Sequence, residues 1–255
     1  MIEDLSVLTR PVAAPDDVVS YGRDSDQVAD VRFGAARATE RPLVMILHGG
    51  FWRPRFDRTH TGPMAVALAA AGWSVASIEY RRIPGQPDVM LEDIGLALGK
   101  LPALISRHNG RVIVVGHSAG GHLALWVAAK RSTARLSGVI ALAPAADLQL
   151  AHDLNLGAGA VLAFLGSQPH TRTDIDPRCM PSPEIDTTLV HGEDDAIVPI
   201  AISESYVAAH PRARLIRVHD TGHFALIDPL STAWPAVTHE LERLARVRLP
   251  GAVPG

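Results

Sequence analysis

The sequence predicts an α/β fold in which a mainly parallel sheet of about eight strands is covered by helices on both faces. Three observations support this prediction. Short apolar runs rich in β-branched residues alternate with segments of helical periodicity along most of the chain. Two early runs show instead the polar–apolar alternation of strands with one solvated face. Near the middle, an apolar run leads directly into a glycine-containing turn and then into a helix, at residues 111–129.

The composition is that of an ordinary globular protein. Of the 255 residues, 47% are apolar and 20% are charged. The formal net charge is -3 and no dense basic block is present, which argues against a nucleic-acid partner. The single cysteine, Cys179, excludes an internal disulfide. We find no signal-peptide pattern and no apolar run of bilayer length, so we expect a cytoplasmic protein without a membrane partner. The oligomeric state stays open.

The first part of the chain predicts an irregular arm followed by two antiparallel strands. Residues 1–16 contain two prolines and show no clear periodicity. Between Asp17 and Phe33, two strand-like runs are joined by a polar link at residues 22–26, which favours a hairpin. Apolar and polar residues alternate in the second run. We therefore expect these strands at an edge of the sheet that is solvated on one face.

From residue 43 onward, apolar runs and helical segments follow one another in βαβ order. We expect buried strands at residues 43–47, 73–78, 112–115, 136–142, 187–190 and 215–218. We expect helices at residues 61–72, 88–101, 122–129 and 200–209, and a last one around Val237, Leu241 and Leu244. Residues 145–185 are long for a plain connection, so we expect a small cap or pocket wall there, within a single domain spanning residues 1–255.

The turn at residues 116–120 has the sequence Gly-His-Ser-Ala-Gly, the pattern of a nucleophile elbow. Because the strand must pass so sharply into the helix, we expect strain in the backbone of Ser118. Side chains at the two glycine positions would collide with the strand and the helix. This geometry would lift the Ser118 hydroxyl clear of the sheet. It would also aim the Ala119 amide, at the positive end of a helix, at the group under attack.

A serine hydroxyl becomes a good nucleophile only when a base takes its proton and a third group orients that base. Two loops downstream supply such groups. Residues 191–199 follow a predicted strand and contain Asp195, and residues 220–224 follow the next strand and contain His223. The carboxyl ends of parallel strands meet at one edge of a sheet, so Ser118, Asp195 and His223 are expected to come together there.

Another glycine pair follows the strand at residues 43–47. The sequence there is His-Gly-Gly-Phe-Trp, and consecutive glycines let backbone amides approach a bound group closely. We expect an oxyanion hole formed by the amides of Gly50, Phe51 and Ala119. For His117, packing is an equal alternative to contact with the substrate. The residues expected to border the substrate are Gly49, Trp52 and His117.

Together these motifs resemble the α/β-hydrolase family, and the match covers roughly residues 40–245. The resemblance implies Ser118 as nucleophile, His223 as base and Asp195 as the acid that orients it. The family motif His-Gly-x-x-Asp-x-x-Val-Pro falls on Asp195 rather than on the neighbouring Asp194. The segment before this acid loop is shorter than in many relatives, so the resemblance does not predict the size of the acyl pocket.

The aromatic pair Phe51-Trp52 resembles the small-molecule esterases and the kynurenine formamidase-like arylformamidases of that family. The sequence is therefore expected to encode a serine hydrolase that cleaves a small carboxylic ester through an acyl-enzyme. The resemblance implies no metal and no other cofactor. One alternative is arylformamidase activity, in which the same residues cleave an N-formyl aryl amide. Another is a non-catalytic binding protein of this fold, although such proteins typically lack a triad member and this sequence has all three.

Overall fold

The computed structural model of the chain describes residues 3–35, 38–130 and 135–246. Its centre is an eight-stranded sheet in the order β1-β2-β4-β3-β5-β6-β7-β8. The strands are β1 (Asp17–Ser20), β2 (Val28–Arg32), β3 (Leu43–Leu47), β4 (Val75–Ile78), β5 (Val112–His117), β6 (Leu136–Leu142), β7 (Thr187–Gly192) and β8 (Arg214–Val218). β2 is antiparallel to both of its neighbours, β1 and β4. All other pairs are parallel, which confirms the predicted sheet and its antiparallel edge.

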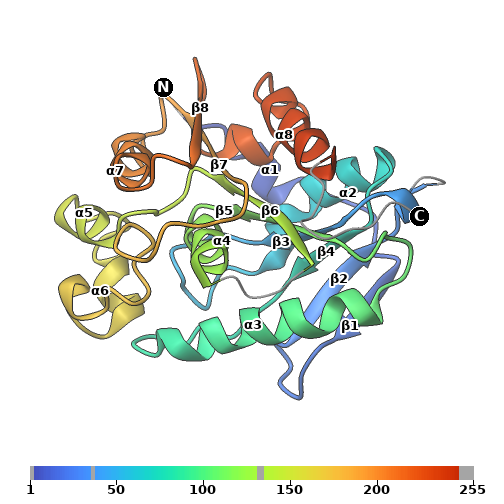
Figure 1. The fold of residues 1–255 in the computed structure, drawn as a ribbon, viewed down its shortest axis with the longest axis horizontal. Coiled ribbons are helices and arrows are strands. Elements are labelled where there is room, and N and C mark those ends of the chain that lie inside the picture. The colour runs from blue at the N-terminus through green and yellow to red at the C-terminus, as the bar shows by residue number, and fades with distance from the viewer. Residues whose placement is uncertain (1–2, 36–37, 131–134, 247–255) are drawn as a thin grey trace.

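Helices cover both faces of this sheet (Figure 1). They are α1 (Ser6–Thr9), α2 (Gly62–Ala70), α3 (Pro87–Leu104), α4 (Ala119–Lys130), α5 (Leu148–Asp153), α6 (Ala160–Leu165), α7 (Ala201–Ala209) and α8 (Trp234–Arg246). Apolar residues of α3 and α4 belong to one core cluster, and those of α2 and α8 belong to the cluster on the other face. In the part of the chain that the structure describes, no helix combines the length and apolar character needed to cross a bilayer.

The central strands are mainly apolar because both of their faces are covered. In β3 every residue is buried. Leu43, Met45 and Leu47 belong to the cluster with α3 and α4, whereas Val44 and Ile46 belong to the cluster with α2 and α8. Such a strand shows a continuous apolar run rather than an alternating one. The outer strand β1 is largely exposed, in keeping with its place at the antiparallel edge.

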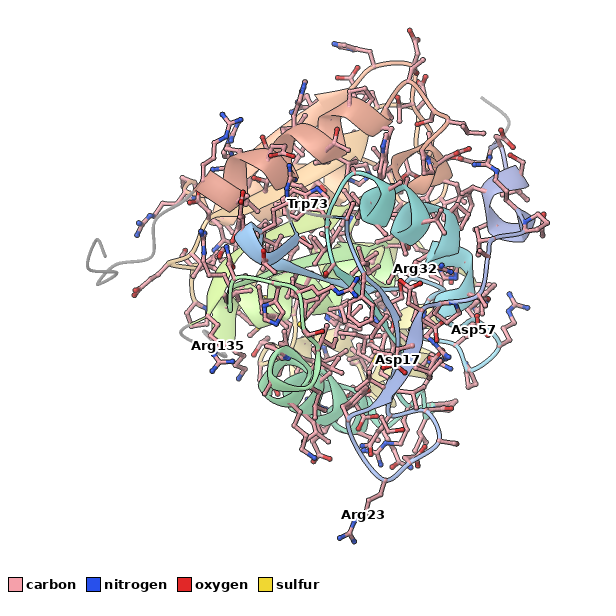
Figure 2. All side chains as sticks on the ribbon, turned by 90° about the vertical axis from the view of Figure 1, so that its right-hand side faces the viewer. Asp17, Arg23, Arg32, Asp57, Trp73 and Arg135 are labelled. Carbon is pink, nitrogen blue, oxygen red and sulfur yellow. The ribbon has the colours of Figure 1, made fainter. Side chains whose placement is uncertain are left out.

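The arm before β1 is more ordered than its sequence predicts. It contains the four-residue helix α1, whose Val7 is buried in the cluster with α2 and α8. Arg32 of β2, labelled in Figure 2, donates to the carbonyl oxygens of Ala13 and Ala14 at 2.6 and 3.0 Å and so fastens the arm to the sheet edge. The predicted hairpin is confirmed, and Arg23 in its loop points away from the rest of the molecule (Figure 2).

Candidate active site

Ser118 lies between the end of β5 and the start of α4, as the elbow pattern predicts. Its φ of 57° is in the left-handed region, so the predicted backbone strain is confirmed. A Cβ atom at Gly116 would lie 2.0 Å from the carbonyl oxygen of Gly120, and one at Gly120 would lie 2.1 Å from that of Leu47. Backbone atoms therefore leave no space for a side chain at either position. Glycine at both positions allows β5, α4 and β3 to approach one another this closely.

Asp195 and His223 follow β7 and β8 and are joined by a hydrogen bond of 2.6 Å between Oδ2 and Nδ1. The other carboxylate oxygen of Asp195 accepts from the amides of Ile197 and Val198, at 2.9 and 2.8 Å. A carboxylate can only accept, so Nδ1 of His223 carries the hydrogen and Nε2 presents a lone pair. Asp194, the competing acid, is exposed.

The electrostatics of this loop keep Asp195 ionised. Burial works to raise the pKa of its carboxyl group, but hydrogen bonds with His191 and His223, together with the Val198 amide, outweigh burial. The pKa of Asp195 is therefore held well below its ordinary value. His191 has partners of its own, because its ring nitrogens lie 2.7 Å from the Ser203 hydroxyl and 2.8 Å from the Val198 carbonyl. His191 thus ties the end of β7 to Val198 in the loop that contains Asp195 and to Ser203 of α7.

Ser118 and His223 border the same cavity, whose volume is about 360 Å³. This is the size of a small-molecule site. Among the described residues, the Ser118 hydroxyl makes no hydrogen bond with the imidazole ring. In unliganded active sites this contact is often long and shortens only when substrate binds. The structure thus pairs Asp195 with His223 and places His223 and Ser118 beside one cavity.

The loop after β3 lies directly against Ser118. A Cβ atom at Gly49 would lie 3.0 Å from Cβ of Ser118. Gly50, Phe51 and Trp52 all have positive φ values, of 110°, 53° and 57°. This left-handed run turns the backbone back on itself beside Ser118, with Gly50 and Phe51 bordering the large cavity.

His48 fixes this glycine loop to the sheet. Its Nδ1 lies 2.8 Å from the carbonyl oxygen of Gly49, and its Nε2 lies 3.1 Å from a carboxylate oxygen of Glu79. Its ring stacks on Tyr80, with centroids 4.3 Å apart, and the Tyr80 hydroxyl donates to the His48 carbonyl at 2.6 Å. His48 thus supports the glycine loop through both ring nitrogens and its carbonyl oxygen.

His117 both borders the cavity and packs against the histidine loop. Its Nε2 lies 3.1 Å from the carbonyl oxygen of His223. Since a carbonyl only accepts, Nε2 carries the hydrogen and Nδ1 has a lone pair. Nδ1 is buried and has no hydrogen-bond partner among the residues described. Burial, and next the nearby His223, hold the pKa of His117 well below its ordinary range, so the ring is neutral.

A much smaller cavity also borders Ser118. Its volume is about 10 Å³, at the lower limit for a single water molecule. Trp52 borders this cavity rather than the large one, and its indole stacks on Phe164 at 4.6 Å and donates to Nδ1 of His122 at 3.3 Å. The residues that border this small cavity are Phe51, Trp52, Ser118, Ala119, Ala145, Ala151, Leu156, Val161 and Val198.

Several residues of the large cavity were not predicted from the sequence. They come from the arm, from the loop after Trp52 and from the loops that contain Asp195 and His223. Neither the arm nor the loop after Trp52 has a periodic pattern from which side-chain direction could be inferred. The additional residues are Leu8, Arg55, Phe56, Asp57, Thr59, His60, Ile197 and Phe224.

Comparisons with known proteins place the chain in a family. The model of the BD-FAE family matches residues 29–209, well over half of the chain. A kynurenine formamidase of Danio rerio is 25% identical over 228 residues, which cover 83% of this chain and 75% of that protein. A kynurenine formamidase of Salmo salar is 33% identical over 110 residues, which cover 43% of this chain and only 37% of that protein.

A solved structure shows the same fold. Esterase B of Lactobacillus rhamnosis superimposes with a TM-score of 0.74 at 21% identity, over 91% of this chain and 86% of that one. The sheet of this chain and the strand–turn–helix around Ser118 agree with that likeness in fold. The chain has the α/β-hydrolase fold and belongs to the BD-FAE family.

Proposed function

We propose that this protein is a serine hydrolase that cleaves a small carboxylic ester through an acyl-enzyme, with Ser118, His223 and Asp195 as its triad. The observation that supports this proposal best is the 2.6 Å hydrogen bond between Asp195 and His223, with His223 bordering the same cavity as the strained Ser118. This bond leaves the lone pair of Nε2 as the base. The names of the relatives, kynurenine formamidases and an esterase, fit the same chemistry.

The proposed reaction has two halves. In the first, Ser118 Oγ attacks the carbonyl carbon while His223 Nε2 accepts the hydroxyl proton. The backbone amides of Gly50, Phe51 and Ala119 stabilise the oxyanion. The tetrahedral intermediate then collapses, the bond to the leaving group breaks, and His223 gives the proton to that group. In the second half, His223 takes a proton from water, hydroxide attacks the acyl-enzyme, and Ser118 leaves with the proton returned.

Ionised Asp195 stabilises the imidazolium that forms in each half of the reaction. Its low pKa means that it stays charged when His223 gains a proton. Its second oxygen is held by two amides, so the carboxylate cannot rotate away from the ring. These contacts orient the base before substrate arrives, which is where much of the rate enhancement of a triad originates.

Arylformamidase activity is the second candidate, and the two cavities favour it as a specific alternative. The small cavity leaves almost no room beside Ser118, whereas the large cavity is bordered by Phe51, Phe56 and Phe224. We propose that the small cavity takes the acyl side and that residues 145–185 form its wall. A formyl or acetyl group fits this arrangement, with an aromatic leaving group in the large cavity. Turnover of N-formylkynurenine beside p-nitrophenyl acetate separates the formamidase from the esterase.

Removal of the Ser118 hydroxyl tests the proposed function directly. We expect Ser118→Ala to lose turnover of p-nitrophenyl acetate by about a millionfold, because no other group replaces the nucleophile. A fluorophosphonate probe should attach to wild-type protein at Ser118 and not to the variant. Near-normal turnover by Ser118→Ala contradicts the proposal. Absence of labelling and turnover in well-folded wild-type protein supports the binding-protein alternative instead.

A further inference from the structure

The backbone of His223 is held at both ends by side chains from distant parts of the chain. Its N–H donates to the carboxylate of Glu3, with both oxygens 2.9 Å from the nitrogen. Its carbonyl oxygen accepts from Nε2 of His117 at 3.1 Å. The ring of His223 has its own partner in Asp195. Every polar group of this residue except Nε2 is therefore anchored, and Glu3 is the anchor that lies 220 residues away in sequence.

The segment that carries Glu3 is fixed in place at several points. Val7 is buried among core residues of α2 and α8. Arg10 forms a bidentate ion pair with Asp228, with nitrogen–oxygen distances of 2.5 and 2.8 Å. Asp228 directly follows the short helical turn Phe224–Ile227, which begins next to His223. Leu8 of the same segment borders the large cavity. The segment is thus joined to the histidine loop at its two ends, through Glu3 and Arg10, and reaches the large cavity with Leu8.

Gly222 has no side chain to obstruct this contact. A Cβ atom there would lie 2.5 Å from Oε2 of Glu3, and its three nearest atoms would all belong to the Glu3 carboxyl group. The backbone at Gly222 does not have a positive φ, so the turn itself does not require glycine. The absent side chain instead leaves the space that the Glu3 carboxylate occupies.

We propose that Glu3 is a positioning residue for His223, and that the segment from Glu3 to Arg10 is a working part of the active site. This inference rests on the proposed function. The carboxylate fixes the backbone from which the base extends, so that Nε2 keeps its direction toward Ser118 through both halves of the reaction.

The test compares variants of Glu3 with a matched change at Asp4, an exposed acid of the same segment. The number of working sites is first counted by titration with the fluorophosphonate probe. We expect Glu3→Ala to lower kcat per titrated site about tenfold, because a small displacement of the base is costly in the acylation step. KM should stay within about twofold, since Glu3 borders neither of the two cavities next to Ser118. Asp4→Asn should behave as wild type.

A purely structural role would give a different result. It would lower the midpoint of thermal unfolding and the number of titrated sites, but the sites that remain would turn over at the wild-type rate. Glu3→Gln tests the contact by conservative replacement, because its side chain keeps an acceptor for the His223 amide. We therefore expect Glu3→Gln to retain kcat per titrated site much closer to wild type than Glu3→Ala does.

Gly222→Ala tests the same contact without altering residue 3. The new methyl group displaces the carboxylate, so this variant should lose kcat by about the same factor as Glu3→Ala, and the double variant should be no worse than either. Unchanged kcat per titrated site in Glu3→Ala and Gly222→Ala overturns the inference. If the wild-type protein is still labelled at Ser118 and active, the proposed function is unaffected by that result. Wild-type protein that is neither labelled nor active overturns both.

Discussion

A single hydrogen bond decides which nitrogen of His223 can act as a base. Asp195 Oδ2 accepts from Nδ1, so the free lone pair, which we propose as the base, lies on the opposite nitrogen, Nε2. The acid is itself immobilised, because the amides of Ile197 and Val198 hold its other oxygen. At the scale of the residue, the chemistry of the site therefore depends less on the presence of three side chains than on the hydrogen bonds that fix their direction.

This argument gives a prediction for Asp195→Asn. The new side chain can keep its oxygen on the two amides and present its NH₂ group to the ring, which would move the hydrogen of His223 to Nε2. We expect kcat to fall about 10⁴-fold with little change in folding, because the ring then lacks a lone pair toward Ser118. Asp194→Asn, measured in the same ester assay, should stay close to wild type because Asp194 is exposed. The reverse pattern contradicts the assignment of the acid.

The sequence predicts these residues because each lies at the carboxyl end of a strand. Parallel order brings the ends of β5, β7 and β8 to one edge of the sheet, so Ser118, Asp195 and His223 could be placed together without coordinates. Glu3 could not be placed, because it is far from any strand and its partner lies 220 residues away. No periodic pattern connects such a pair, and only the packing of α1 on the core brings it about.

At the scale of the element, the strands were easier to predict than the pieces between them. β3 to β7 are buried at every residue, and apolar residues predominate in β3 to β6. The predicted helix at residues 61–72 is confirmed with the shorter bounds Gly62–Ala70. Thr61 precedes it, and its hydroxyl donates to the Arg58 carbonyl oxygen at 2.7 Å instead of capping the helix. Loop side chains depend on distant partners, such as the ion pair of Arg58 with Asp30, and local sequence does not specify these.

The segment with α5 and α6 supports a prediction about acyl size. Leu156 lies between these helices and borders the small cavity, which holds almost no free space. We expect kcat/KM for p-nitrophenyl esters to fall at least about tenfold from acetyl to butyryl, because each added methylene must displace packed side chains. Leu156→Ala should restore much of the butyryl rate. Leu154→Ala, which changes an exposed neighbour, is the matched control and should not. A flat acyl series in the wild type contradicts the placement of the acyl group.

At the scale of the whole molecule, a buried polar network joins the glycine loop of the site to the sheet. Glu79 follows β4, and its side chain is 3% exposed. One carboxylate oxygen contacts His48 and Arg82, and the other accepts from the Arg58 amide at 3.1 Å. Through His48, the same carboxylate supports the loop that contains Gly50 and Phe51. Loss of this charge is therefore expected to affect both folding and the site.

The pH dependence of stability tests this network. Burial works to raise the pKa of Glu79, but His48, Arg82 and the Arg58 amide outweigh it and lower the pKa to about 2, from an ordinary value of 4.5. A carboxyl group with a lowered folded-state pKa stabilises the fold above its unfolded pKa, and this stabilisation is lost as the pH falls through the folded pKa. The loss should occur between pH 4.5 and about 2 and amount to about 3 kcal/mol at most.

We expect urea unfolding to show this loss as a fall in the free energy of unfolding between pH 5 and pH 3. Glu79→Gln should be less stable than wild type at pH 7, because it leaves Arg82 without its buried countercharge. Its stability should nevertheless depend less steeply on pH, because the titrating group is gone. Glu92→Gln, a change at an exposed position of α3, should keep the wild-type slope. Equal slopes in Glu79→Gln and wild type would show that the acid sensitivity arises elsewhere, with Asp195 as the next candidate because its pKa is lowered in the same direction.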